Sequence, residues 1–453
     1  MRVVLVNPPK LSDFPGDSCI PPLGLLYIAS VLEKNGHEVH LVDAGLGSEK
    51  PEKVASKALG LDPEIVGITS MTPTYPAAEA VARRLKAEGV FTVMGGPHVT
   101  FRPGEALEVC DAVVMGEGEL SFSKLVEAVS SGTSLSRVPG ISFKKGRKIV
   151  TTEPSRIRNL DDLPMPAYHL LDFEAYQKKY PPSAVRKTPW ISYSSSRGCP
   201  FGCFYCSVTE FWGRVWRGHS AERVAADLRH LAETYSLESV FFVDDNFTFR
   251  RERIIRLCSE IKDLGIEWCC SCRVDQVDGE LLKKMSEAGC WRIGFGIEAG
   301  TQEVIDWYGK RITVEKAKEA VKLCRENGIS PFCFFIIGAP VETEEMMERT
   351  IEAAKEIDPD IIGVSFLTPF PGSKLYDYAE KNGLLLTRDW KKYDETEPTI
   401  KTPVPWERIV EMNRRMYREF YFRPRYIFRR LRDFVKNPAL VIRGLRTIWK
   451  WVR

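Results

Sequence analysis

Three cysteines in a short glycine-rich stretch are the residues of this 453-residue chain whose types and spacing point most directly to chemistry. Cys199, Cys203 and Cys206 follow the spacing C-x3-C-x2-C. Thiolates at this spacing can each bind one iron of a cubane 4Fe–4S cluster and leave the fourth iron without a protein ligand, whereas clusters that only carry electrons usually have four cysteines. A cluster with an open iron can bind a substrate or a cofactor.

The residues around these cysteines suit a loop wrapped closely around a cluster. Gly198, Pro200 and Gly202 favour tight turns and close approach of the backbone. Two alternatives follow from the residues alone: a zinc site without its fourth ligand, and chance clustering in a chain with twelve cysteines. A structural zinc site usually adds a second Cys or His pair at regular spacing, and none stands out nearby.

With Tyr205 before its last cysteine, the motif C-x3-C-x-aromatic-C resembles the signature of the radical S-adenosylmethionine (SAM) superfamily. The resemblance implies that the amino and carboxylate groups of SAM chelate the open iron. It also implies that the reduced cluster cleaves the sulfonium and yields a 5′-deoxyadenosyl radical, which abstracts hydrogen from unactivated carbon.

The elements that must position this loop form two successive patterns of alternating strands and helices, so an α/β protein is expected. Residues 1–150 predict a doubly wound parallel sheet. Six strand runs within residues 190–385 predict a (β/α)6 partial TIM barrel with its chemistry at the carboxyl-terminal face. Residues 151–189 form a proline-punctuated linker, and residues 386–453 a helical, basic C-terminal region.

Glycines and short polar side chains follow the predicted strands of the first domain, where ligands of doubly wound sheets bind. The candidate ligand residues are Asn7, Thr69, Ser70, Gly95, Gly96, Gly116, Glu117 and Gly118. No G-x-G-x-x-G follows the first strand, which disfavours a dinucleotide. Placed before a radical SAM core, this arrangement resembles the Rossmann-like cobalamin-binding domain of the cobalamin-dependent radical SAM enzymes. The alternative is a degenerate Rossmann module that only helps assembly.

The cobalamin resemblance has one departure. Many cobalamin domains supply a cobalt-binding histidine from an Asp-x-His-x-x-Gly motif, and here Asp43 is followed by Gly45 at the histidine position. A lower imidazole ligand from this motif is therefore ruled out. His98 is the other histidine at a strand end, and stabilisation of a turn is favoured over contact with cobalt.

Polar residues at the ends of the predicted barrel strands are candidates for binding SAM. Asp244 and Asp245 stand where superfamily members carry a Gly-Gly-Glu-like motif for the SAM ammonium group, although Gly-Gly-Glu itself is absent. A helix N-cap by Asp245 or Asn246 is the alternative. Arg273 could pair with the methionine carboxylate or, alternatively, with its neighbour Asp275.

The resemblance implies three further SAM contacts. Glu298 would bind the ribose hydroxyls or the amino group, Ile337 begins the segment that flanks adenine, and Tyr205 lies in the cluster motif itself. A second group of cysteines, at positions 269, 270 and 272, lies on a predicted strand. Adjacent strand residues point to opposite faces, so these cysteines are expected to be buried small side chains rather than ligands of an auxiliary cluster.

Charge is distributed unevenly along the chain. The net charge is +3, but residues 413–453 carry +11 and the remainder −8. Apolar residues recur at helical spacing in residues 441–452 with cations on the other side, which suits an anionic membrane surface. The alternative is a helix that folds back on the barrel, and nucleic acid is not expected because no binding module is recognised.

The resulting hypothesis is a cobalamin-dependent radical SAM methyltransferase that acts on an unactivated carbon through a 5′-deoxyadenosyl radical and methylcobalamin. Its cofactors would be a 4Fe–4S cluster, SAM and cobalamin, its electron donor a flavodoxin or ferredoxin, and its substrate a small or lipid-like molecule. Unpaired cysteines and the lack of a signal peptide predict the cytoplasm, with peripheral contact at the inner face of the membrane. Alternatives are a radical SAM cyclase without net methyl transfer and a non-enzymatic iron–sulfur carrier or scaffold.

Overall fold

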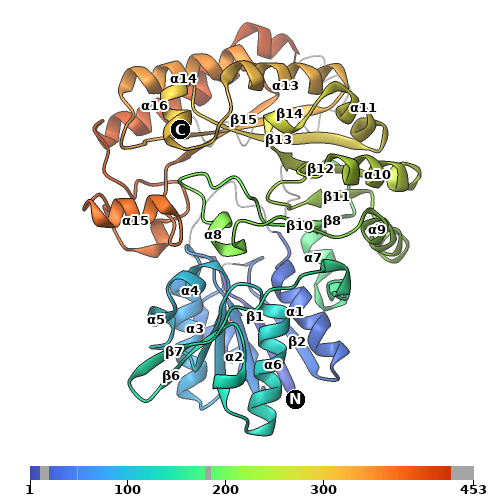
Figure 1. The fold of residues 1–453 in the computed structure, drawn as a ribbon, viewed down its shortest axis with the longest axis vertical. Helices are drawn as coiled ribbons and strands as arrows, with labels where there is room; N and C mark the ends of the chain where they lie inside the picture. Colours follow the sequence, from blue (N-terminus) through green and yellow to red (C-terminus); the bar gives the residue numbers. More distant parts are fainter. Residues whose placement is uncertain (11–19, 48, 179–184, 430–453) are drawn as a thin grey trace.

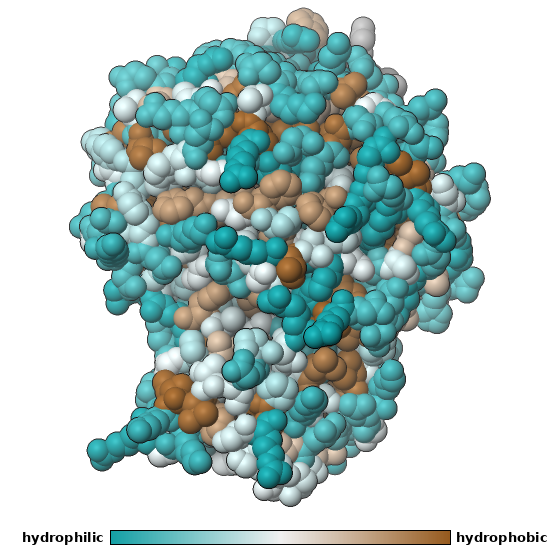
Figure 2. Space-filling view, viewed as in Figure 1, coloured by the Kyte–Doolittle hydropathy of each residue, from teal (hydrophilic) through white to brown (hydrophobic). Residues whose placement is uncertain are grey.

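The computed structural model describes residues 1–10, 20–47, 49–178 and 185–429. They form two α/β units, one drawn in blue to teal at the bottom of Figure 1 and one drawn in green to red above it. On the face shown in Figure 2, hydrophilic residues cover most of the surface and hydrophobic residues form separate patches. In the part of the chain that the structure describes, no helix has the length and apolar character needed to cross a membrane.

The N-terminal unit is a seven-stranded sheet with the strand order β2-β1-β3-β4-β5-β6-β7. Its strands are β1 (Arg2–Asn7), β2 (Glu38–Asp43), β3 (Ile65–Thr69), β4 (Phe91–Gly95), β5 (Ala112–Val114), β6 (Ile141–Lys145) and β7 (Lys148–Thr151). The first five are parallel, and the last two add an antiparallel hairpin. The order reverses between β1 and β3, which is the point where ligands of such sheets bind. The predicted doubly wound sheet is confirmed.

Helices cover both faces of this sheet. The helices are α1 (Leu23–Lys34), α2 (Pro51–Leu59), α3 (Tyr75–Ala87), α4 (Pro97–Phe101), α5 (Pro103–Ala106) and α6 (Gly118–Ser131). The core on one side contains residues of α1 and α6, and the core on the other contains residues of α2 and α3. Because strands of a parallel sheet are covered on both faces, they read as continuous apolar runs such as residues 3–6. The sequence did not predict α2, whose nine residues include only three buried ones.

The C-terminal unit is the predicted partial barrel, a six-stranded parallel sheet with the order β15-β14-β13-β12-β11-β8. The strands are β8 (Trp190–Tyr193), β11 (Ser239–Phe242), β12 (Glu267–Cys272), β13 (Cys290–Glu298), β14 (Ser330–Ile337) and β15 (Ile361–Phe366). The helices between them are α9 (Ala221–Tyr235), α10 (Arg251–Ile261), α11 (Gly279–Glu287), α12 (Gln302–Trp307), α13 (Val314–Glu326) and α14 (Glu344–Ile357).

Four of these helices begin at side chains that the sequence places for capping. The side chains of Ser220, Asp278, Thr313 and Thr343 each accept a hydrogen bond from the backbone N–H three residues later. Each cap satisfies a backbone donor that the first helical turn would leave unpaired. The caps thereby fix the residue at which each helix begins, and each helix then leads the chain back to the next strand.

Short elements lie within both units as well as in the segment between them. They are the 3₁₀ turns Leu135–Arg137, Leu160–Asp162, Tyr168–Leu170, Lys262–Leu264, Val274–Gln276 and Trp390–Lys392, the helices α7 (Phe173–Lys178) and α8 (Val208–Trp212), and the strands β9 (Ser196–Arg197) and β10 (Arg217–Gly218). The antiparallel pair β9–β10 encloses the cysteine motif. The segment between these two strands, residues 198–216, contains the motif cysteines and α8 and is thus tied at both ends.

The C-terminal region packs on the barrel through α15 (Lys374–Lys381) and α16 (Trp406–Tyr421). On α16, Tyr421 and Tyr417 accept hydrogen bonds from Ile362 N and Val364 N of the edge strand β15, at 3.1 and 2.9 Å. These hydrogen bonds occupy backbone N–H groups of the edge strand that could otherwise pair with a strand of another chain. In the described part of the basic tail, Arg423 and Arg429 pair with Asp358 at 2.9 and 2.8 Å. The predicted amphipathic helix at 441–452 lies outside the described residues.

Candidate functional site

The cysteine motif lies directly after β9, at the carboxyl-terminal face of the barrel strands. Gly198 has a φ of +88°, and a Cβ there would lie 2.1 Å from the carbonyl oxygen of Val215, so no side chain fits at this position. Gly202 also has a positive φ, of +71°. The two glycines give the loop a curvature that L side chains rarely adopt.

The donor set of this loop fits an iron–sulfur cluster. Cys199, Cys203 and Cys206 are half-buried free thiols. Burial raises the pKa of all three, whereas the cations of Lys310 and Arg273 oppose that shift at Cys203. Thiolates are the ligands that such clusters require. Among the residues that the structure describes, no three His, Cys, Asp or Glu side chains are close enough together to hold a single metal ion.

Two aspartates after β11 hold the segment that leads into the motif. Asp244 is buried and accepts hydrogen bonds from Ser195 N, Ser195 Oγ and Ser196 Oγ at 2.7, 2.6 and 2.5 Å. Gly198 N donates to Asp245 Oδ2 at 2.8 Å, so the second aspartate holds the first residue of the cysteine loop. The geometry therefore gives Asp244 a positioning role instead of the predicted contact with the SAM ammonium, which stays a prediction for Asp245. The alternative of an N-cap is wrong, because Arg250 is the N-cap of α10.

Arg273 pairs with its neighbour Asp275, which was the alternative to a contact with the methionine carboxylate. Its guanidinium pairs with both oxygens of Asp275 at 2.9 Å and donates to the carbonyl oxygen of Lys310 at 2.7 Å. It also lies 3.9 Å from the ring centroid of Phe201, which stands between the first two motif cysteines. Arg273 thus packs against the cluster loop, and its contact with the methionine carboxylate stays a prediction.

Two buried residues, Glu298 and Lys310, form a triad with the half-buried Tyr205 of the motif. Tyr205 donates its hydroxyl to Glu298 Oε1 at 2.8 Å, and Lys310 forms an ion pair with the same oxygen. Glu298 adopts a φ of +74°, a conformation that non-glycine residues reach mainly where the surroundings enforce it. Sequence analysis missed Lys310. The available signal was a lysine 12 residues after Glu298 in the sequence. Whether that lysine reaches the Glu298 carboxylate depends on how the intervening helix α12 packs.

A cavity of about 280 Å³ opens next to this triad. Its lining residues are Tyr205, Gly296, Glu298, Phe334, Phe335, Ile336, Ser365, Phe366, Leu367, Thr368, Phe370 and Glu395. Ile337, which was expected to flank adenine, has a buried side chain in the core, and its neighbour Ile336 lines the cavity instead. The reason is the alternation of side chains along a strand, which sends neighbours to opposite faces.

The loop after β14 contains a buried carboxyl group whose charge affects stability. Glu342 accepts hydrogen bonds from Gly338 N and Ala339 N, both at 2.7 Å, and burial raises its pKa to about 7. The folded state therefore holds a proton that the unfolded state releases near pH 4.5, so stability falls as pH rises between these values, by about 3 kcal/mol in total.

Glu342→Gln is expected to remove most of this pH dependence, because glutamine keeps the accepting oxygen and carries no charge. Urea unfolding of the variant and the wild type at about pH 5 and about pH 8 checks it. Glu348, an exposed carboxylate on the following helix α14 that pairs with Arg415, provides the control Glu348→Gln, which should retain the wild-type slope. Equal slopes for all three proteins would contradict the prediction.

The candidate ligand residues of the first domain line the carboxyl edge of its sheet. Gly96 has a φ of +100°, and a Cβ there would lie 2.6 Å from Ser70 O, so the loops after β3 and β4 touch through backbone. At Gly45 a Cβ would lie 2.4 Å from Asn7 Nδ2, and Asn7 donates to Asp43 at 2.8 Å. This packing leaves no room for a side chain at the histidine position of the motif. An edge of glycines and small polar groups fits a large ligand that approaches backbone, and the individual cobalamin contacts stay predictions.

Glu117, by contrast, has a different role from the predicted cobalamin contact. It accepts from Arg197 and Arg217 at 2.8 Å each and from Ile157 N at 3.0 Å, and Arg197 also pairs with Glu119 at 2.5 Å. We call these four charged side chains, Glu117, Glu119, Arg197 and Arg217, the interdomain ion cluster. Because Arg197 is two residues before the first motif cysteine, the cluster ties the sheet edge of the first domain directly to the cysteine loop.

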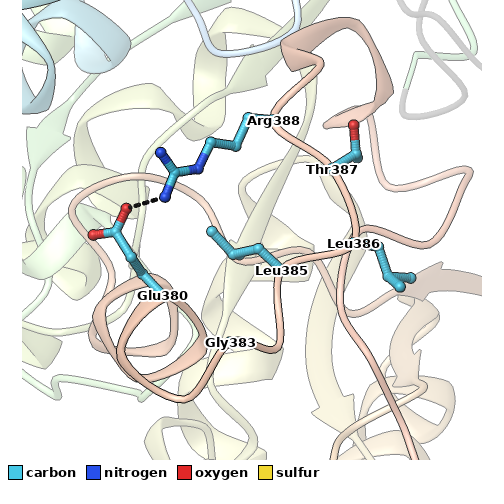
Figure 3. Close-up of a pocket in the computed structure, with 6 residues that line it drawn as sticks. All are labelled: Glu380, Gly383, Leu385, Leu386, Thr387 and Arg388. Atoms are coloured by element: carbon cyan, nitrogen blue, oxygen red, sulfur yellow. Dashed lines mark hydrogen bonds and ion pairs between the residues drawn. The ribbon is translucent and has the colours of Figure 1, made fainter.

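The remaining predicted residues are structural. His98 is fully buried between the rings of Tyr75 and Trp390, with centroids 4.2 and 5.0 Å away, so it packs the domain core and is not available to a ligand. The three cysteines at 269, 270 and 272 are buried, as expected of small core side chains. A second cavity, of about 360 Å³, lies over α15, where Arg388 pairs with Glu380 at 3.0 Å (Figure 3). None of the predicted site residues lines it.

Comparison with known proteins supports the interpretation of both domains. A family model described as the Radical SAM superfamily matches residues 193–354, and one described as the B12 binding domain matches residues 16–126. The uncharacterized methyltransferase PH0819 of Pyrococcus horikoshii is 39% identical over 99% of this chain and 99% of its own length. The anaerobic magnesium-protoporphyrin IX monomethyl ester cyclase of Rubrivivax gelatinosus is 31% identical over 94% of this chain and 78% of its own.

The fold has a counterpart among solved structures. The radical SAM methyltransferase TsrM from Kitasatospora setae, with cobalamin and a 4Fe–4S cluster bound, superimposes with a TM-score of 0.71 at 19% sequence identity. The match covers 84% of this chain and 75% of that protein. The two chains therefore share the arrangement of a Rossmann-like sheet followed by a partial barrel.

Proposed function

Because this chain belongs to the cobalamin-dependent radical SAM enzymes, we propose that it is a methyltransferase acting on an unactivated carbon. A relative that is 39% identical over nearly the whole chain is named a methyltransferase. The observation that supports the proposal most is the interdomain ion cluster, which holds the ligand edge of the B12-binding domain against the cysteine loop. A methyl donor and a hydrogen-abstracting centre must face the same substrate carbon, and a direct contact between the two domains at this point supports that arrangement.

The residues present fit the cofactors that this function needs. When bound, the cluster and SAM supply hydrogen abstraction, and cobalamin supplies the methyl group. Cys199, Cys203 and Cys206 would hold the cluster. Lys310, beside Cys203 and Glu298, would offer its ammonium to a carboxylate, while Tyr205 keeps the Glu298 carboxylate oriented.

The substrate and partners follow from the same proposal. The substrate is a small or lipid-like molecule, and an external flavodoxin or ferredoxin supplies the electron. We place the enzyme in the cytoplasm, where unpaired cysteines and a cluster persist, with contact of the basic tail at the inner face of the membrane as a further part of the proposal. A radical SAM cyclase without net methyl transfer is the second candidate, favoured by the 31% identity to a cyclase.

Anaerobically reconstituted protein is expected to bind hydroxocobalamin in a one-to-one ratio, seen as a shifted visible absorbance after gel filtration. Cys199→Ala should bind it equally well, because the cysteine lies in the other domain. With reductant and SAM, 5′-deoxyadenosine together with S-adenosylhomocysteine supports methyl transfer, and 5′-deoxyadenosine alone supports the cyclase. A protein that binds no cobalamin would overturn the proposal.

A further inference from the structure

We propose that the end of α16 and the residues that follow it form a docking surface for a bilayer that contains anionic lipids. The surface consists of three exposed apolar side chains and three exposed arginines, which we call the tail patch: Phe422, Ile427, Phe428, Arg414, Arg418 and Arg425. The apolar side chains enter the interface of the bilayer, and the arginines contact lipid phosphate groups. This inference rests on the membrane contact in the proposed function and deepens it, because that contact was predicted for residues 441–452 and is here assigned to described side chains.

The apolar part of the tail patch is strongly exposed. Phe428 and Phe422 are 70% and 55% exposed, the two highest values among the large apolar side chains of the described residues, and Ile427 is 43% exposed. A single apolar side chain on a surface is ordinary, whereas several close together mark a site of contact with a protein or a membrane. Three such side chains within seven residues therefore indicate a partner.

The chain holds these apolar side chains at the surface. Arg423 and Arg429 pair with Asp358 at 2.9 and 2.8 Å, and the Tyr426 hydroxyl donates to the carbonyl oxygen of Asp360 at 3.0 Å. Because these three inward-facing residues recur at every third position, they fix which side of the segment faces the barrel. The phenylalanines therefore cannot turn inward unless these contacts break.

The charge of the tail patch is positive. Arg414 and Arg418 are exposed and lie four residues apart on α16, so they share one side of the helix. The side chain of Arg425 is 81% exposed and comes no closer than 3.7 Å to the Asp358 carboxylate. The one acid in the last two turns of α16 is Glu419, which already pairs with two cations, and no acid follows it in the described chain. An anionic partner would therefore meet no unpaired negative charge on this segment.

A bilayer with anionic headgroups fits both parts of the tail patch, because it offers phosphate groups next to an apolar layer. Interfacial segments combine arginine or lysine with phenylalanine, leucine or tryptophan in this way, and each cation near an anionic membrane surface adds to the affinity. The sequence beyond the described residues has the same composition, since residues 430–453 contain Lys or Arg at seven positions, one acid, and the tryptophans Trp449 and Trp451. An acidic protein could pair with the arginines but would offer no continuous apolar layer to the phenylalanines.

Flotation of the reconstituted full chain with lipid vesicles tests this inference. One set of vesicles contains equal parts of phosphatidylglycerol and phosphatidylcholine, and the other contains phosphatidylcholine alone. The enzyme should bind the anionic vesicles about tenfold more tightly, and added salt should weaken this binding. The double variant Phe422→Ser with Phe428→Ser should lower the affinity for anionic vesicles about tenfold, because two apolar side chains no longer enter the interface. Ile149→Ser with Leu386→Ser is the matched control and should bind like the wild type, since these apolar side chains are 47% and 49% exposed elsewhere on the chain.

Two further variants separate the contributions to binding. Arg414→Gln with Arg418→Gln should weaken binding to anionic vesicles and leave binding to neutral vesicles unchanged. Trp449→Ser with Trp451→Ser changes the sequence beyond the tail patch. Loss of binding in this tryptophan variant alone would assign the contact to residues 441–452 and overturn the inference, whereas weaker binding in both the tryptophan and the phenylalanine variants supports it.

Three other outcomes would overturn the inference: no binding to either vesicle, equal affinity for both vesicles, or wild-type binding by the phenylalanine variant with wild-type melting behaviour. In the last case, a smaller oligomer on gel filtration would identify a second copy of the chain as the occupant of the patch. None of these measurements depends on turnover. A failure to form S-adenosylhomocysteine would therefore count against methyl transfer alone.

Discussion

Replacing Cys203 with alanine is expected to abolish formation of 5′-deoxyadenosine from SAM. Each cysteine of the motif would hold one iron, and three thiolates are the whole protein donor set of such a cluster. Loss of one leaves two protein ligands on a solvent-accessible loop, so iron content and the visible absorbance of the cluster should fall together with activity. Anaerobic reconstitution followed by iron analysis and chromatography of the nucleoside products measures both.

Cys258→Ala is the matched control for that experiment. Cys258 is a buried cysteine on α10, outside the motif. Its replacement is expected to leave the iron content of the protein unchanged. The same result is expected for Cys199→Ala and Cys206→Ala as for Cys203→Ala. If any of the three variants kept a full cluster and produced 5′-deoxyadenosine at the wild-type rate, its assignment as a ligand would be wrong.

Arg197→Met is expected to destabilise the protein by about 3–5 kcal/mol, because it leaves two buried carboxylates with fewer cations. The side chains of Arg197, Glu117 and Glu119 are 7%, 5% and 4% exposed. The guanidinium also lies 5.0 Å from the ring of Tyr27 and 5.6 Å from that of Trp212, so both domains and the cysteine loop lose a shared anchor. Urea unfolding, followed separately by far-UV circular dichroism and tryptophan fluorescence, measures the change and shows whether the domains still unfold together.

A second arginine close to the same loop provides the control for Arg197→Met. Arg214 pairs with Glu210 at 3.0 Å, but these side chains are 55% and 40% exposed, so Arg214→Met should cost less than about 1 kcal/mol. Dipolar electron paramagnetic resonance between the reduced cluster and cob(II)alamin should show a broader distance distribution in Arg197→Met than in Arg214→Met. Equal stability and equal distance distributions in the two variants would show that the interdomain ion cluster does not position the domains.

The sequence by itself determined the local features of this protein. Continuous apolar runs such as residues 3–6, alternating with helical stretches, predicted both parallel sheets and the succession of their strands along the chain. The cysteine motif was equally readable, because its ligands lie within eight residues and need no distant partner to be recognised. The hydrophobic periodicity of a strand or helix and the spacing of the motif cysteines depend only on residues close together in the sequence, so they can be recognised before the fold is known.

Tertiary structure alone decided which polar groups meet. Glu117 was expected to contact a ligand, but it pairs with arginines 80 and 100 residues away, and Lys310 reaches Glu298 only because α12 folds back. Glu395 enters the cavity from a segment with no strand or helix pattern of its own. A buried charge must find a partner, and which one it finds depends on how separate elements pack against each other, a relation that no local pattern of residues encodes.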